Sequence, residues 1–173
     1  MSNSKHIYLE TKNLIVRQYT MDDVDGLHEV MSNSQVHQYT KDKIQPWDKY
    51  KTEKYTQFFI DKNFVTSECF HGAIIEKASN KIIGLTGLNP YNKDEPEIEW
   101  KLGVTYWNKG YATEIGKEII KEAFKTTKII GIYGMVEQEN TASRRVLQKI
   151  DMEYLGLKEF RNHQDAFYYI GRI

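Results

Sequence analysis

Cysteine, net charge and long apolar segments are what this sequence lacks. Cys69 is the single cysteine among 173 residues, so the chain can form neither an internal disulfide nor a cysteine-based metal site. The 24 basic and 24 acidic side chains cancel, whereas nucleic-acid-binding and membrane-surface proteins usually carry a surplus of positive charge. We therefore expect a protein of a reducing compartment that binds no metal and no nucleic acid.

No segment of the sequence predicts insertion into a membrane. The longest run of apolar residues and glycine, 129–136, is far too short to span a bilayer. The N-terminal stretch MSNSKHIYLE lacks the apolar core of a signal peptide. Neither a repeat nor a linker rich in proline and glycine divides the chain. These absences predict a soluble cytoplasmic protein of one domain, residues 1–173, with no membrane partner.

The sequence does contain a mixed succession of strand and helix patterns. Strands are expected over 6–20, 69–77, 81–89, 96–104, 128–136, 152–160 and 165–173. Helices are expected over 20–31, 45–63, 110–125 and 140–150. Thr20 and Asn140 suit the N-caps of the first and last helices, and Pro46 suits the first turn of the second. The order β-α-α-β-β-β-α-β-α-β-β predicts a mixed α/β domain in which 96–136 is a parallel β-α-β unit.

The stretch YWNKGYATE, residues 106–114, joins an alternating strand to a long amphipathic helix. A helix start offers free backbone N–H groups and a partial positive charge, which together favour an anion. Gly110 and Ala112 would keep side chains away from a phosphate group, and Lys109 would add a positive charge. Equally, Gly110 could simply end a loop while Ala112 packs, because an isolated short motif is weak evidence.

Three stretches together resemble the GNAT superfamily of N-acyltransferases, and within it the RimJ/RimL-type branch. They are LETKNLIVRQYTMDDVDGLHEVM, EIEWKLGVTYWNKGYATE and ENTASRRVLQKIDMEYLG. With the element order, the resemblance covers nearly the whole chain. It implies a central, mostly antiparallel mixed sheet with one splayed parallel pair of strands, flanked by helices. It also implies acetyl-CoA as co-substrate.

The resemblance implies a role for each residue that matches a family motif. The family loop Gln/Arg-x-x-Gly-x-Gly/Ala is matched at Gly110 and Ala112, while Trp107 replaces its first residue, as is usual in this branch. The implied pyrophosphate turn consists of Lys109, Gly110, Tyr111, Ala112, Thr113 and Glu114. Leu102, Gly103 and Val104 would pair with the pantetheine, and a backbone N–H there would polarise the acetyl carbonyl. Asn140 would hydrogen-bond the pantetheine arm.

Proton transfer is where the sequence departs from the general superfamily. The family often has a tyrosine, as the acid for the leaving thiolate, where this chain has Leu147. Ser143, one turn earlier on the same face, is the expected substitute and also a cofactor contact; its alternative role is a hydroxyl bonded to the helix backbone. Glu97 is the preferred base for the acceptor amine, and Glu99, His71 or a water molecule are the alternatives.

The leading hypothesis is an acetyl-CoA-dependent N-acetyltransferase that transfers acetyl directly to a primary amine, on a protein N-terminus or a small molecule. A non-catalytic acyl-CoA sensor of the same fold is the alternative, and a nucleotide-binding protein is less favoured because no Gly-x-Gly-x-x-Gly signature is present. An acyl-enzyme is not expected, since Cys69 has no evident activating partner. The acidic stretch NKDEPEIE fits a cationic acceptor or a solvated loop. A homodimer through an edge strand stays open.

Overall fold

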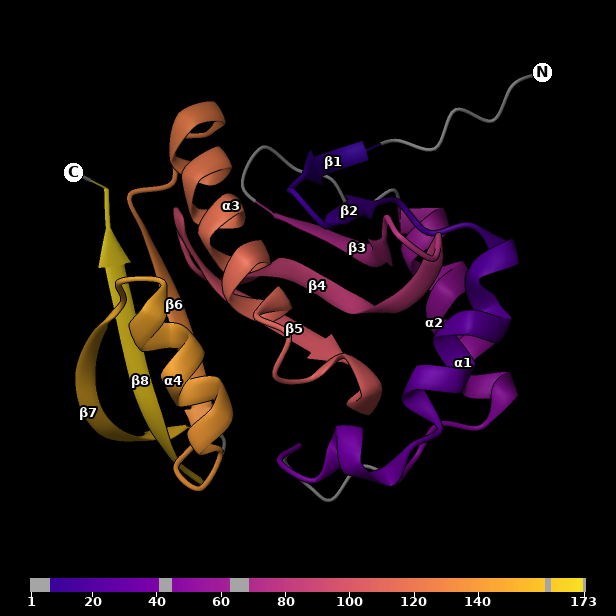
Figure 1. The fold of residues 1–173 in the computed structure, drawn as a ribbon. Coiled ribbons are helices and arrows are strands. Elements are labelled where there is room, and N and C mark those ends of the chain that lie inside the picture. The colour runs from indigo at the N-terminus through magenta and orange to yellow at the C-terminus, as the bar shows by residue number, and fades with distance from the viewer. Residues whose placement is uncertain (1–6, 41–44, 63–68, 161–162, 173) are drawn as a thin grey trace.

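The computed structural model describes residues 7–40, 45–62, 69–160 and 163–172. Eight strands form one sheet in the order β1-β2-β3-β4-β5-β6-β8-β7 (Figure 1). The strands are β1 Ile7–Glu10, β2 Leu14–Arg17, β3 Phe70–Glu76, β4 Lys81–Asn92, β5 Glu95–Leu102, β6 Gly131–Glu137, β7 Glu153–Phe160 and β8 His163–Gly171. Neighbouring strands are antiparallel except β5 and β6, which are parallel. The predicted mixed α/β fold with one parallel pair is confirmed.

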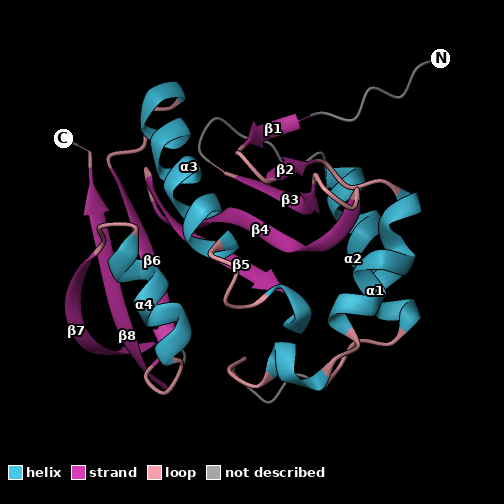
Figure 2. Cartoon of the chain, viewed as in Figure 1, coloured by secondary structure: helices cyan, strands magenta, loops and turns pink. Residues whose placement is uncertain are grey.

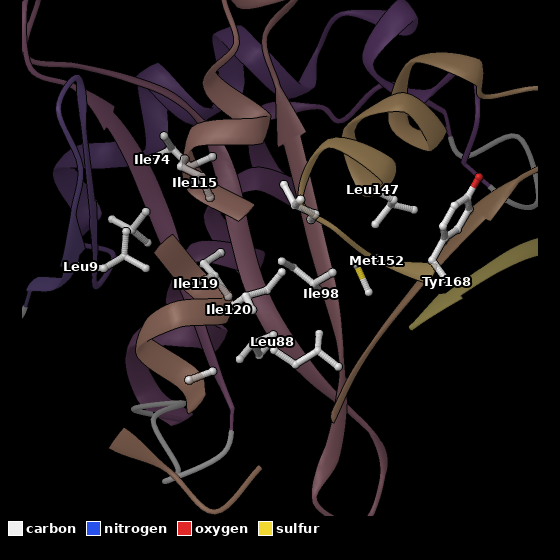
Figure 3. Close-up of a cluster of buried hydrophobic side chains, with 14 of the residues drawn as sticks. Leu9, Ile74, Leu88, Ile98, Ile115, Ile119, Ile120, Leu147, Met152 and Tyr168 are labelled. Atoms are coloured by element: carbon white, nitrogen blue, oxygen red, sulfur yellow. The ribbon is translucent and has the colours of Figure 1, made fainter. Parts of the chain in front are cut away.

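Helices cover both faces of the sheet (Figure 2). They are α1 Val24–Met31, α2 Lys49–Lys62, α3 Tyr111–Thr126 and α4 Thr141–Lys149, with short 3-10 turns η1 Met21–Asp23, η2 Ser34–His37 and η4 Val104–Tyr106. One apolar core lies between the sheet and α3 and α4, and includes Ile115, Ile119 and Leu147 (Figure 3). A second core, with Leu27 and Met31 of α1, lies on the opposite face. The alternation of β5 therefore sends Ile98 to the α3 side and the residues on either side of it to the α1 and α2 side.

The N-terminal strand expected over 6–20 is wrong in one respect: the segment is a hairpin of β1 and β2. The backbone N–H of Thr11 donates to Leu14 O at 2.9 Å, and Leu14 N donates to the Thr11 hydroxyl oxygen at 3.0 Å. A threonine side chain thus closes a turn that contains no glycine. The two arms share one alternating pattern, so the pattern alone does not show the break.

Two helix starts also differ in detail from expectation. The segment after Thr20 begins as the 3-10 turn η1 before it becomes α1. Helix α2 begins at Lys49, and Asp48 caps it by accepting from Lys51 N at 2.7 Å, so Pro46 lies before the helix and not in its first turn. Asp151 has a φ of 64°, the left-handed conformation that aspartate tolerates better than most residues.

A buried ion pair fixes the start of the α1 segment to β2. The two guanidinium nitrogens of Arg17 each lie 2.7 Å from a carboxylate oxygen of Asp23, and Thr20 N donates to Asp23 at 2.7 Å. Burial tends to raise the pKa of Asp23, but the hydrogen bonds from Arg17 and Thr20 and the charge of Arg17 outweigh it and lower the pKa. Asp23 is therefore ionised throughout the neutral range and depends on Arg17 for compensation.

Arg17→Met should lower the free energy of unfolding by about 3 kcal/mol at neutral pH, since it leaves a buried charge unpaired. The folded-state pKa of Asp23 is depressed, so its contribution is present above the ordinary aspartate pKa of about 3.9 and is lost as the pH falls below it. The difference in free energy of unfolding between wild type and variant should therefore become smaller at acidic pH. Urea unfolding from pH 7 to pH 3 measures this.

Lys49→Met is the matched control, because it breaks the exposed pair between Lys49 and Asp25, 2.7 Å apart, in the same region. This variant should unfold like the wild type. Equal losses in the two variants would show that the buried position of the Arg17–Asp23 pair contributes nothing.

Candidate active site

The parallel strands β5 and β6 meet at a single register pair, Glu97 with Tyr133. Beyond that point they diverge toward their C-terminal ends (Figure 1). The other edge of β5 stays paired with β4 as far as Leu102, opposite Gly84. The strand therefore presents one unpaired backbone edge to a wedge-shaped opening in the middle of the sheet.

The register of β5 decides which backbone groups face this opening. Gly103 N donates to Ile83 O of β4 at 2.9 Å, so the N–H of Gly103 points away from the opening. Successive residues of a strand alternate in this respect, so the N–H of Leu102 points toward it. The Leu102 carbonyl accepts from the indole Nε1 of Trp107 at 2.8 Å. Among the three residues expected to pair with pantetheine, Leu102 offers the free donor, and Trp107 anchors the following loop.

Helix α3 begins beside this edge with an uncovered backbone. Gly110 is its N-cap with a φ of 81°, and a Cβ added there would meet no atom within 4 Å. The first intrahelical bond runs from Glu114 N to Gly110 O at 3.0 Å. The backbone N–H groups of Tyr111, Ala112 and Thr113 precede that bond and have no acceptor within the helix. Gly110 thus meets a backbone requirement and also keeps the helix start open.

The side chains around the helix start hold it in place. Asn13 donates to both carboxylate oxygens of Glu114, from its backbone N and its Nδ2, each at 2.8 Å. Glu114 was expected in the pyrophosphate turn, but its N–H and its carboxylate are both used within the protein. Lys109 Nζ lies 3.9 Å from Glu76 Oε1, to which the Tyr111 hydroxyl donates at 2.8 Å. The carboxylate of Glu76 therefore partly neutralises the charge of Lys109.

Asn140 and Ser143 lie at the start of helix α4, and the predicted cap at Asn140 is confirmed. Asn140 caps the helix: its Oδ1 accepts from Ser143 N at 3.0 Å. This cap uses the amide oxygen of Asn140 and leaves the two N–H donors of Nδ2 for another partner. Ser143 takes part in the cap through its backbone N–H, so its partly exposed hydroxyl is not needed for capping.

Leu147 is a core residue and cannot act in proton transfer. It is 2% exposed and lies in the same core as Met152 and Tyr168 (Figure 3). A Cβ added to Gly134 of β6 would lie 2.5 Å from Leu147 Cδ2, so side chain and strand are in close contact. The position that is often tyrosine in the superfamily is filled here by packing.

On the opposite face of the sheet, His71 and Glu99 form a hydrogen-bonded pair. His71 Nε2 lies 2.6 Å from Glu99 Oε1, and the Tyr19 hydroxyl lies 2.9 Å from His71 Nδ1. Tyr55 of α2 completes the cluster, with its hydroxyl 3.1 Å from His71 Nε2. The His71 side chain is 1% exposed and the Glu99 side chain 36%, so Glu99 is the member that solvent reaches.

The network sets the charge state of its members. Burial tends to raise the pKa of Glu99, but hydrogen bonds from His71 and Asn89 and the charges nearby outweigh it, and the net shift is downward. Burial raises the pKa of Tyr19 and of Tyr55 well above the ordinary value. Both phenols are thus neutral and Glu99 is an anion at neutral pH. No sequence pattern indicates the two tyrosines, because they come from segments distant from His71.

The acidic stretch before β5 is not one continuous patch. Glu95 accepts from the Tyr169 hydroxyl of β8 at 3.0 Å, and Asp94 occupies a turn with a φ of 60°. Glu97 lies at the junction with Tyr133, in register with Asn89, and Glu99 is in the next row of the sheet with Gly87. Of the two candidate bases on β5, the described hydrogen bonds join Glu99, and not Glu97, to His71.

A cavity of about 470 Å³ lies beside the end of β5. Its walls are Gly26, Glu29, Val30 and Asn33 of the α1 region, Lys81 and Ile82 of β4, and residues 103–106. The cavity adjoins Gly103 and Val104, and the His71–Glu99 pair is not part of its wall.

Comparison with known proteins identifies the family. Residues 13–153 match the model of the acetyltransferase (GNAT) domain, and the chain belongs to this family. It is 27% identical over 160 residues to the uncharacterized N-acetyltransferase p20 of Bacillus licheniformis, covering 91% of this chain and 88% of that one. The protein is therefore an N-acetyltransferase.

Two solved structures resemble this one. A GNAT-family acetyltransferase from Bacillus anthracis has a TM-score of 0.83 and 25% identity, covering 95% of this chain and 98% of that one. The ribosomal L7/L12 α-N-protein acetyltransferase RimL in complex with coenzyme A has a TM-score of 0.79 and 15% identity, covering 96% and 98%. The second likeness shows the fold alone.

Two negative findings apply to the described residues. No helix among them is long and apolar enough to cross a membrane. Nor do they contain a group of three or more histidine, cysteine, aspartate or glutamate side chains that could hold a metal ion.

Leu147→Tyr should not improve the enzyme, although it restores the residue that is common elsewhere in the superfamily. The larger ring would overpack a core site against Gly134, at a cost of about 1–3 kcal/mol. Thermal unfolding and a thiol-release assay test this together. A stable variant with a faster rate would show that the site accepts a general acid at this position.

Proposed function

We propose that the protein transfers an acetyl group from acetyl-CoA directly to a primary amine, as a RimJ/RimL-type member of its family. One observation carries the proposal: the uncovered start of α3 lies next to the unpaired edge of β5. An anion-binding helix start and an adjacent strand edge suit a long ligand that has phosphates at one end and amide groups along its length.

The residues at this edge fit the cofactor. The backbone N–H groups of Tyr111, Ala112 and Thr113 would hold the pyrophosphate, with Lys109 as the nearby positive charge. The unpaired edge of β5 at Leu102 would pair with the pantetheine amides, and Asn140 Nδ2 would donate to the same arm. When bound, the cofactor supplies an acetyl thioester. The N–H of Leu102 is the backbone donor placed to stabilise negative charge on the acetyl oxygen.

The acceptor amine would approach from the α1 and α2 face, where Glu99 is the exposed member of the His71 network. Glu99 would hold the ammonium form by a charge-assisted hydrogen bond. The lowered pKa of Glu99 makes it a weak base. The arrangement therefore favours an α-amine, whose pKa is about 7.7–8.0, over a lysine-like amine with a pKa of about 10.4. Ser143 would donate to the leaving thiolate.

Glu97, the base preferred from sequence, stays a second candidate for proton transfer. It shares the face of Glu99 and lies at the narrow end of the opening, in register with Tyr133. The two carboxylates can be separated by experiment because each is changed to its amide without a change of shape.

Gly110→Glu should weaken coenzyme A binding by about 100-fold, because a carboxylate would lie where the pyrophosphate must sit. Gly156→Glu is the matched control. Gly156 also has a positive φ, 92°, and open space around its Cβ position, but it lies on β7. Both variants carry the same backbone strain of about 1–2 kcal/mol. Isothermal titration with coenzyme A measures the two affinities, and equal values in the two variants would rule out a pyrophosphate site at the start of α3.

Glu99→Gln should reduce kcat/KM for an amine acceptor by about 100-fold while Glu97→Gln changes it much less. Coenzyme A affinity should be unaffected in both. Since the pKa of Glu99 is lowered, its carboxylate stays ionised at pH values below those at which a glutamate ordinarily becomes protonated. Loss of wild-type activity between pH 8 and pH 5 should then follow protonation of the acceptor amine. The reverse order of the two variants would return Glu97 to the role of base.

A further inference from the structure

Lys101 is a cation that neither the proposed cofactor contacts nor the proposed proton transfer uses. It follows Glu99 on the same face of β5, two residues along the strand. It is only partly exposed. The described residues place no carboxylate within 4.0 Å of its Nζ, although six other lysine or arginine side chains among them form ion pairs.

The surroundings of Lys101 on the α1 and α2 face add positive charge and a free donor. Lys51 Nζ lies 5.3 Å from the centre of the Trp47 ring, and the rings of Trp47 and His37 lie 6.1 Å apart. Burial lowers the pKa of His37, and the charges of Lys101 and Lys51 lower it further, although its bond to Met31 O opposes this. Lys101 and Lys51 thus both add positive potential at His37.

Trp47 supplies a second, independent observation. Trp47 is only 7% exposed, yet its indole Nε1 has no hydrogen-bond partner within the described part of the chain. The indole N–H is a donor only, so the group that would satisfy it is an acceptor. A buried donor without a partner is costly, and an acceptor bound beside Trp47, where Lys51 also lies, would remove that cost.

We propose that the acceptor is a small amino-acid-like molecule that carries a carboxylate beside its primary amine, with the amine at Glu99 and the carboxylate at Lys101. The inference rests on the proposed acetyl transfer and defines its substrate class. Glu99 and Lys101 form the two ends of a dipolar site on one strand face, about 7 Å apart at the backbone because strand residues rise by about 3.3–3.4 Å each.

The same charges disfavour a polyamine. A second ammonium group would meet Lys101 and Lys51, and like charges in a partly buried site repel strongly. A carboxylate in that position accepts charge-assisted hydrogen bonds instead. The aromatic side chains of Tyr55 and Phe59, which pack near His71, would contact the rest of the molecule.

The test compares each of several L-amino acids with its own carboxamide, and includes spermidine as a polyamine. Thiol release measures kcat/KM for wild type, Lys101→Met and Lys101→Arg, and for Lys54→Met as a control on the exposed side of α2. Methionine keeps the apolar stem of the lysine, so the fold should be retained. Because each ratio of acid to carboxamide is compared between variants, differences in amine basicity cancel.

Wild type should prefer the best amino acid to its carboxamide by at least about tenfold, the effect of one charge-assisted hydrogen bond. Lys101→Met should abolish this preference while its rate on carboxamides stays within about twofold of wild type. Lys101→Arg should keep part of the preference, and Lys54→Met all of it. Equal use of acids and carboxamides by wild type, preference for spermidine, or a preference that survives in Lys101→Met would overturn the proposal.

Failure of the proposal and failure of the proposed function give different results. Turnover of carboxamides without preference for acids leaves acetyl transfer standing and removes the role of Lys101. If no amine is turned over, acetyl transfer to these amines fails. The carboxylate site is then judged by tryptophan fluorescence titration of the same pairs in the presence of coenzyme A. In that titration wild type must bind the amino acid about tenfold more tightly than its carboxamide, and Lys101→Met must bind the two equally. Equal or undetectable binding by wild type overturns the carboxylate site.

Discussion

The single register pair between β5 and β6 is the constraint on which the rest of the site depends. Backbone N–H and C=O groups must find partners, and eight strands in one sheet would normally satisfy them across every interior edge. Here the parallel pair is joined only at Glu97 and Tyr133, so the edge of β5 beyond that point stays unpaired inside the sheet. The starts of α3 and α4 flank the same opening, with Gly110 and Asn140 as their N-caps. One local failure of strand pairing thus leaves an open strand edge between two helix starts.

The side that we propose for the acceptor depends on a different constraint, the absence of a side chain at Gly87. His71, Gly87 and Glu99 lie in one row across β3, β4 and β5. A Cβ at Gly87 would lie 3.0 Å from the His71 ring and would press on the Phe70 carbonyl. The glycine in the middle strand therefore lets the imidazole reach across to the carboxylate two strands away. Without that gap, Glu99 would lose the hydrogen bond that keeps it ionised and oriented.

Features that depend on neighbouring residues could be predicted from the sequence. The bare helix start at Gly110, the cap at Asn140 and the alternation of β5 all follow from local pattern, and the structure confirms each. The His71–Glu99 pair could not be predicted, because it depends on the register of three strands. The pattern of residues 6–20 predicts one strand where the structure has a hairpin, since Thr11 closes the turn without glycine. Pro46 lies before α2 and not in its first turn, because Asp48 caps the helix. Glu114 matched a motif position, but a partner 101 residues away uses its carboxylate.

The two halves of the site therefore differ in what determines them. The side that we propose for the cofactor is built mainly from backbone groups, whose positions follow from the fold, and a chain only 15% identical has the same fold with a TM-score of 0.79. The side that we propose for the acceptor is built from side chains on β3, β5 and α2, so it depends on the identity of each residue. Membership of the acetyltransferase (GNAT) family consequently supports acetyl-CoA as co-substrate and says little about the amine. For the amine, the charges on one face of β5 carry the argument: Glu99 is bound by His71, while Lys101 has no partner at hydrogen-bonding distance among the described residues.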